Sequence, residues 1–304
     1  MHRNLFTFIV LICVLCGTGF SGNILVPSHY GTIQEAIDAA VEDPDPLLSD
    51  VVVVSDGNYP ECIDFKGKAI TVRSESNDPR YALIDGSGFA GKSVVDFHSG
   101  EGTDSVLKGF TITGGSGYFG GGIECNSSSP TIENCIIKEN TAERDGGGID
   151  CFNSGAVFAD CVISLNNPGR DGGGISVYEC NSSSPSFFNC LIYGNSSIGK
   201  GGAVYVYNSS NISFSNCTVV DNVSQHTVDE FSLNTYGGIY VNDGSNQSSI
   251  LIKNSILWGN VIDLSAPGCI VDHSTVQFSD NALQIYDKDP GFTEGLLVII
   301  IFAR

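Results

Sequence analysis

Acidic and aromatic residues recur at two equivalent positions after a repeated glycine-rich corner, and these residues are the best placed for chemistry. The first position holds Glu124, Asp150, Ser176, Tyr205 and Tyr240, and the second holds Asn126, Phe152, Tyr178, Tyr207 and Asn242. Side chains two residues apart on a strand share one face, opposite the apolar residues between them. We therefore expect a flat outward strip, free of packing, that is acidic at one end and aromatic at the other.

This strip predicts a surface that contacts glycans. Aromatic rings pack on the apolar faces of sugars, while flanking carboxylates and amides bind hydroxyl groups. The predicted ligand-binding residues are Glu124, Asp150, Phe152, Tyr178, Tyr205, Tyr207 and Tyr240. The alternative is a solvated sheet in which Tyr and Phe occur only because they favour strands.

Glu124 and Asp150 lie on adjacent repeats and could act together. Their carboxyl groups could approach the separation of about 5 Å that a retaining glycosidase uses. They could also share a Ca²⁺ ion, although no cofactor and no metal site is assigned. Neither outward position carries Lys or Arg, so the base that a polysaccharide lyase needs is missing from the strip. No catalytic residue is assigned.

Charged residues form a second cluster just before the glycine corners, comprising Arg144, Asp145, Arg170, Asp171 and Lys200. This cluster could bind an acidic sugar, or it could be a ladder of surface ion pairs that stabilises little. The longest insertion, residues 223–235, holds His226, Asp229 and Glu230. Loops on rigid scaffolds often carry function, but one His with two acids also fits a solvated loop.

All these residues are positioned by a repeat that occurs five times. An anchor position holds Cys135, Cys161, Cys190, Cys217 and Ser255, and five residues later stand Asn140, Asn166, Asn195, Asn222 and Asn260. The apolar residues alternate over segments of four to six, which is the pattern of strands. A repeat of this length that stacks on its own copies predicts an all-β solenoid of about eight coils, roughly 4.8 Å apart. Stacked asparagines would then form a hydrogen-bonded ladder.

The Gly-Gly-Ala/Gly-Ile/Val corners and the Ile/Val/Leu-x-x-Asn segments resemble the pectate-lyase-like family of right-handed parallel β-helix proteins. They are also similar to the repeats of chlamydial polymorphic outer-membrane proteins. The resemblance covers most of residues 24–277 and implies a right-handed parallel β-helix. The polygalacturonase-like Gly-His-Gly and Arg-Ile-Lys motifs are missing, so it implies no particular activity.

The chain divides into four segments. Residues 1–22 read as a secretory signal peptide, with an apolar run from Leu5 to Leu15 that is too short for a comfortable membrane span. Residues 23–50 predict a strand and a capping helix, with Thr32 as N-cap and Glu35 three residues later. Residues 51–277 are expected to form the β-helix. Residues 278–304 are expected to be an irregular, truncated tail, because an apolar end without a polar capping repeat is unusual for a solenoid.

Nine cysteines follow the signal peptide. Neighbours in a stack lie farther apart than the Cβ separation of about 3.8 Å that a disulfide prefers. We therefore expect buried free thiols, and without a Cys-x-x-Cys pair we expect no zinc site.

A formal net charge of −20 should repel nucleic acids and anionic membranes. We expect a secreted or extracytoplasmic, non-catalytic β-helix that contacts polysaccharide or another cell-surface glycan. Two alternatives stay open, namely a polysaccharide lyase or glycoside hydrolase, and a structural spacer or adhesin passenger fragment.

Overall fold

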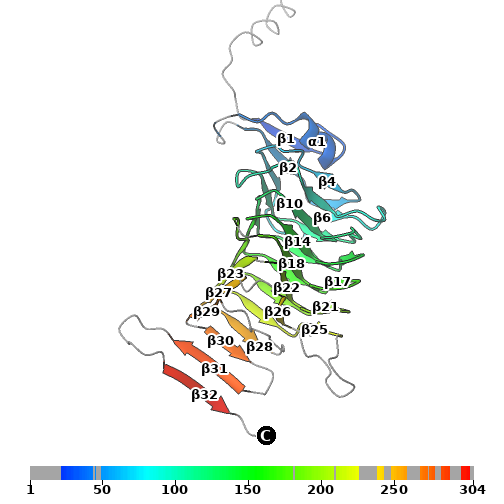
Figure 1. The fold of residues 1–304 in the computed structure, drawn as a ribbon. Helices are drawn as coiled ribbons and strands as arrows, with labels where there is room; N and C mark the ends of the chain where they lie inside the picture. The colour runs from blue at the N-terminus through cyan, green and yellow to red at the C-terminus, as the bar shows by residue number, and fades with distance from the viewer. Residues whose placement is uncertain are drawn as a thin grey trace, which may run out of the picture.

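The protein is a parallel β-helix of about seven turns, close to the eight expected (Figure 1). The computed structural model describes residues 22–43, 45, 49–180, 182–208, 210–225, 238–242, 248–258, 268–272, 274–277, 282–287 and 296–301. The predicted all-β solenoid is confirmed. Each turn of the chain contributes one short strand to each of three long sheets.

Sheet A holds β1 (Asn23–Val26), β2 (Val51–Val54), β5 (Thr71–Ser74), β8 (Val106–Lys108), β11 (Thr131–Glu133), β15 (Val157–Ala159), β19 (Ser186–Phe188), β23 (Asn211–Ser215), β27 (Ser249–Lys253) and β29 (Gly268–Asp272). Sheet B holds β3 (Gly57–Tyr59), β6 (Ala82–Asp85), β9 (Thr111–Thr113), β12 (Ile136–Lys138), β16 (Val162–Ser164), β20 (Leu191–Tyr193), β24 (Thr218–Val220), β28 (Ile256–Trp258), β30 (Ser274–Gln277), β31 (Ala282–Asp287) and β32 (Leu296–Ile301). Sheet C holds β4 (Ile63–Asp64), β7 (Val95–Phe97), β10 (Ile123–Asn126), β14 (Ile149–Phe152), β18 (Ile175–Tyr178), β22 (Val204–Tyr207) and β26 (Ile239–Asn242). Two small pairs, β13 (Thr141–Ala142) with β17 (Asn167–Pro168) and β21 (Ser196–Ser197) with β25 (Val223–Ser224), complete the turns.

Equivalent residues of successive turns lie in register. In sheet C, Ile123 pairs with Ile149, which pairs with Ile175. Insertions between repeats therefore fall at the corners and leave the strands aligned. The result is a set of columns in which like residues stack along the solenoid axis.

Two kinds of residue make the corners. The residue before the anchor position has a positive φ of 48–56° in Asn134, Asp160, Asn189, Asn216 and Asn254. Asn and Asp adopt this left-handed conformation more readily than other side chains. Gly120, Gly146 and Gly172 hold positive φ before sheet C, and a Cβ on Gly146 would lie 2.4 Å from the carbonyl oxygen of Ile149. The column of Asn and Asp in the sequence is thus a backbone requirement.

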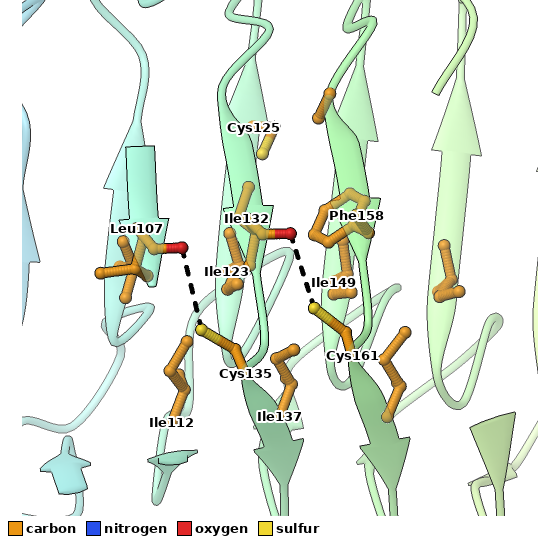
Figure 2. Close-up of a cluster of buried hydrophobic side chains, with 14 of the residues drawn as sticks. Leu107, Ile112, Ile123, Cys125, Ile132, Cys135, Ile137, Ile149, Phe158 and Cys161 are labelled. Carbon is orange, nitrogen blue, oxygen red and sulfur yellow. Dashed lines mark hydrogen bonds between the residues drawn. The ribbon is translucent and has the colours of Figure 1, made fainter. Parts of the chain in front are cut away.

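The interior is filled by apolar columns and by thiols (Figure 2). Phe158 and Phe187 stack with ring centroids 4.7 Å apart. The Cys135 thiol lies 3.9 Å from the carbonyl oxygen of Leu107, and the Cys161 thiol lies 3.6 Å from that of Ile132, so each links one coil to the preceding one. All eight cysteines whose state the structure describes are free, as predicted.

The predicted asparagine ladder is present, and its members Asn140, Asn166, Asn195 and Asn222 are buried. The Asn166 amide donates to Asn195 Oδ1 at 3.0 Å and to the Ile137 carbonyl oxygen at 3.0 Å. Asn195 Oδ1 also accepts the backbone N–H of Asn166 at 3.1 Å. The Asn166 side chain therefore links its coil to the coils on both sides, since its Oδ1 also accepts from Asn140. Asn260, the last predicted member, lies outside the described residues.

Helix α1 (Ile33–Ala39) covers the N-terminal end of the solenoid (Figure 1). The Thr32 side chain accepts the Glu35 N–H at 3.1 Å, as the capping box predicts. Ile33, Ala36 and Ile37 are fully buried, so the apolar face of the helix closes the core.

The other end differs from the expected irregular tail. Strands β31 and β32 pair antiparallel with each other, and β31 pairs antiparallel with β30. The run of Leu, Val and Ile in β32 favours an extended strand, and the open edge of sheet B offers unpaired backbone groups. The signal peptide predicted for residues 1–22 lies, apart from Gly22, outside the described residues. Within the described part of the chain, no helix has the length and apolar character needed to cross a membrane.

Candidate functional site

The outward face of sheet C borders a cavity of about 680 Å³. Its lining includes six of the seven predicted ligand-binding residues, Glu124, Asp150, Phe152, Tyr178, Tyr205 and Tyr207. It also includes Arg144, Asp145, Arg170 and Asp171 from the corner before sheet C. The outward strip and the charged cluster before the corners, which the sequence suggests separately, therefore line the same cavity.

The strip is not flat and not free of packing, contrary to expectation. Asp150 is 5% exposed, Ser176 is 3% exposed and Tyr205 is 8% exposed. The corner residues line the same cavity and shield the first outward column from solvent. Alternation along a strand predicts which side chains point outward, but it does not predict what then covers them.

Asp150 lies between two neighbours on adjacent strands of sheet C. Glu124 on β10 and Ser176 on β18 are its register partners. The Ser176 hydroxyl is hydrogen-bonded to Asp150 Oδ1. Burial raises the pKa of Asp150 to about 8, with the Ser176 hydrogen bond opposing the rise and the Glu124 charge adding to it. Burial therefore favours the protonated form of Asp150.

Glu124 is partly shielded as well. Burial raises its pKa, while a 3.4 Å hydrogen bond with the Ser93 hydroxyl lowers it. The outward column continues beyond Glu124 through Asp96 on β7 to Asp64 on β4. Burial, followed by the Glu124 charge, raises the pKa of Asp96 to about 6.

Asp64 and Asp96 were not among the predicted site residues, because the early coils lack the glycine-rich corner. A sequence signal exists nonetheless. Ile63-Asp64-Phe65 and Val95-Asp96-Phe97 have the same apolar–acidic–apolar pattern as Ile123-Glu124-Cys125 and Ile149-Asp150-Cys151. Four acidic residues thus stand in line on four successive strands.

Arg170 is held by two carboxylates from the corners before sheet C. Its guanidinium forms a bidentate ion pair with Asp145, and its Nε lies 3.4 Å from Asp171 Oδ2. Asp145 is 6% exposed and the Arg170 side chain is 46% exposed, so this ion pair lies half-buried at the edge of the cavity. Burial raises the pKa of Asp171, opposed by the backbone N–H of Lys200.

Arg144 has different partners. Its guanidinium donates to the Tyr118 hydroxyl at 3.2 Å and lies 5.8 Å from the ring centroids of both Tyr118 and Phe119. Among the residues that the structure describes, Arg144 forms no ion pair with a carboxylate. Two arginines therefore line the cavity, although neither outward position of the strip carries a cation.

The aromatic residues form a ladder along the axis. Phe152 stacks on Tyr178 with centroids 5.4 Å apart, and Tyr178 stacks on Tyr207 at 5.1 Å. The rings therefore face one another across the coils. Phe152 begins the ladder, because its register partner on β10 is Asn126 and not an aromatic residue.

The remaining candidates lie apart from the cavity. Tyr240 stacks on Tyr205 at 6.0 Å but does not line the cavity, and its hydroxyl accepts from Lys200 Nζ at 2.8 Å. His226, Asp229 and Glu230 lie outside the described residues. Within the described ranges, no group of three or more His, Cys, Asp or Glu residues is arranged to hold a metal ion.

Comparison with known proteins identifies the fold. The family model described as "Right handed beta helix region" matches residues 62–219 and 144–283. No curated protein matches the chain. Among solved structures, the pectin methylesterase from Aspergillus niger in deglycosylated form is 13% identical, with a TM-score of 0.43, over 79% of this chain and 86% of that one. The same enzyme in penultimately deglycosylated form is 12% identical, with a TM-score of 0.40, over 79% and 86%.

Proposed function

The chain belongs to the right-handed β-helix family, and we propose that on this fold it binds a saccharide in the cavity beside sheet C. The observation that carries the proposal is the composition of this one cavity, which combines an aromatic ladder with carboxyl, amide and guanidinium groups. Saccharide sites commonly pair an aromatic ring with polar side chains that bind hydroxyl groups. The bound sugar would be part of a polysaccharide or of a cell-surface glycan.

The ladder suggests where a sugar ring would lie. The tyrosine rings already stack on one another, so they do not offer a separate face to each sugar unit. Phe152 lacks an aromatic neighbour on β10. A sugar ring above Asn126 would stack on Phe152 and continue the ladder by one coil, roughly 4.8 Å. Glu124, Asp150 and Arg144 would then be within the same cavity to bind its hydroxyl groups.

Phe152 provides the test. In a screen of immobilised polysaccharides with and without Ca²⁺, Phe152→Ala should weaken retention by roughly 1 kcal/mol, about five-fold, the low end of aromatic stacking energies. Phe152→Tyr should keep binding, because the column already accommodates Tyr178. The matched control is Tyr193→Ala, which removes a 38% exposed aromatic from sheet B, away from the cavity.

Undiminished retention by Phe152→Ala would show that the saccharide binds elsewhere. Tyr205 is a poor substitute for this test, because at 8% exposure its removal would disturb packing. We also propose that the protein acts outside the cytoplasm, on the basis of the apolar leader at residues 5–15. Detection of the intact N-terminus in the mature protein would contradict export with cleavage.

A catalytic role is the second candidate, because Asp150, whose pKa is raised by burial, adjoins Glu124 on the neighbouring strand. A glycoside hydrolase would use one as general acid and the other as nucleophile or base. A lyase would use a cation such as Arg144 or Arg170. The same screen separates these activities, because hydrolysis releases reducing ends and elimination produces unsaturated, ultraviolet-absorbing sugars.

A further inference from the structure

We propose that Asp150 is a neutral carboxylic acid that donates a hydrogen bond to an uncharged saccharide, so that the cavity selects neutral over acidic sugars. This inference rests on the proposed function and specifies its ligand. It follows from the position of Asp150 in the cavity and from how the neighbouring charges are already paired.

Asp150 is buried without a cation. Two guanidinium groups line the same cavity, and that of Arg170 is engaged by Asp145 and Asp171. Among the described residues, no ion pair involves Asp150. A buried carboxylate without a counter-ion is costly, and such a group takes up a proton instead. The burial-driven rise of its pKa to about 8 agrees with this geometry.

The charged and titratable groups around Asp150 do not reverse this conclusion. They are Glu124 on β10, Asp96 beyond it on β7, Arg144, Asp145, Arg170 and Asp171 at the corners before β14 and β18, and Tyr205 and Tyr207 on β22. Glu124 and Asp145 add negative charge and favour the protonated form of Asp150. Among the residues that the structure describes, the Ser176 hydroxyl on β18 is the one neutral side-chain group hydrogen-bonded to Asp150.

A neutral Asp150 has one proton to donate. Its Oδ1 is occupied by Ser176, and its carboxyl group lines the cavity. A sugar hydroxyl or ring oxygen can accept a hydrogen bond from the protonated carboxyl group of Asp150. An ionised Asp150 could only accept hydrogen bonds. The donor role therefore disappears when the group ionises.

The same charges disfavour an acidic sugar. A uronate entering the cavity would meet the carboxyl groups of Glu124, Asp145 and Asp171. Arg170 is already bound by two of them, which leaves Arg144 as the one arginine of the lining without a carboxylate partner among the described residues. In a partly desolvated site, repulsion from several carboxylates outweighs the attraction of the single half-buried cation Arg144.

The first experiment needs no ligand. The carboxyl carbon of Asp150, identified by its absence from ¹³C NMR spectra of Asp150→Asn, should titrate near pH 8 in the free protein. Titration in the ordinary range around pH 4 would overturn the proposal. Asp104→Asn, which removes an exposed acid, is the matched control and should leave this signal unchanged.

The second experiment uses neutral xylan, mannan and β-glucan oligosaccharides against oligogalacturonate and alginate oligosaccharides. Wild-type protein should bind a neutral probe more tightly than any acidic one. Its affinity for the neutral probe should fall roughly tenfold as pH rises through 8, because about one hydrogen bond is lost. Asp150→Asn keeps a donor at every pH, so its affinity should not show this fall. Asp104→Asn should behave as wild type.

The outcomes separate the two proposals. Tighter binding of the acidic probes, or an alkaline fall that persists in Asp150→Asn, overturns the inference while the proposed function stands. If no probe is retained by wild-type protein at any pH, the proposed function is wrong, and the saccharide named here is wrong with it, whatever the NMR titration shows.

Discussion

The buried asparagines show most clearly how one residue per coil holds neighbouring coils together. Asn195 accepts two hydrogen bonds from Asn166, and its amide donates to the Ile163 carbonyl oxygen at 2.9 Å and to Asn222 Oδ1 at 2.9 Å. All four of its hydrogen-bonding positions are used in a fully buried site. A buried amide network of this kind is stabilising only while it is complete.

Asn195→Leu should therefore lower the free energy of unfolding by about 1–3 kcal/mol, because it leaves the donors of Asn166 and the carbonyl oxygen of Ile163 without partners. Denaturant unfolding followed by circular dichroism measures the change. Asn58→Leu, at an exposed position on β3, is the control and should have little effect. Equal stability of the two variants would show that the ladder contributes nothing.

Asp150 has the opposite effect on stability. Its pKa is near 3.8 in the unfolded chain and about 8 in the folded protein, because burial disfavours the charge. Between these values only the folded state holds the proton, so stability falls as pH rises from 4 to 8. A residue that destabilises the fold at neutral pH is a candidate for function.

Asp150→Asn should accordingly be more stable than wild type at neutral pH, on the order of a few kcal/mol, and similar to it near pH 4. Thermal unfolding across this pH range is the measurement. A variant that loses stability equally at every pH would mean that the carboxyl group is ionised in the folded protein or is needed for packing.

At the scale of secondary-structure elements, the strands are short and the corners determine the path of the chain. The Asn and Asp residues before the anchor position adopt positive φ, and the interior is then filled by whichever side chains point inward. Thiols serve here as small apolar groups that also bond to backbone carbonyls. The Cys190 thiol, for example, lies 3.4 Å from the Phe158 carbonyl oxygen of the preceding coil.

Denatured, unreduced protein should therefore react with iodoacetamide at all eight cysteines that the structure describes. In the native protein only Cys62 should react, and slowly, because it alone of the eight is partly exposed and burial raises its pKa to about 11. Mass spectrometry counts the labels. Fewer than eight labels on the denatured chain would reveal disulfides.

At the scale of the whole molecule, the sequence predicts the architecture because successive coils carry the same pattern of residues. Positions such as Cys135 and Asn140 occupy equivalent environments in successive coils, so the same residue types return with the same spacing inside each repeat. The capping helix was predictable for a similar reason, since Thr32 and Glu35 satisfy local backbone groups.

The cavity was less predictable, because its depth depends on contacts between segments that no periodicity links. Arg170 and Asp145 come from different corners, and their pairing beside Asp150 requires the coils to be stacked in three dimensions. The stacking of Phe152, Tyr178 and Tyr207 on one another was also missed, because an outward position says nothing about ring orientation.

Uniform register makes this scaffold modular. Thr141 pairs with Asn167 one coil further on, so excision of residues 141–166 would join Asn140 to the residue that already occupies the equivalent corner. Asn140 would then meet Asn195, and the interior columns would close over the junction. The shortened solenoid would keep every kind of contact between coils, yet it would lose Asp145, Asp150 and Phe152 together. The length of the solenoid can therefore change by whole coils without changing how the coils pack. The choice of ligand, in contrast, depends largely on the residues of one coil.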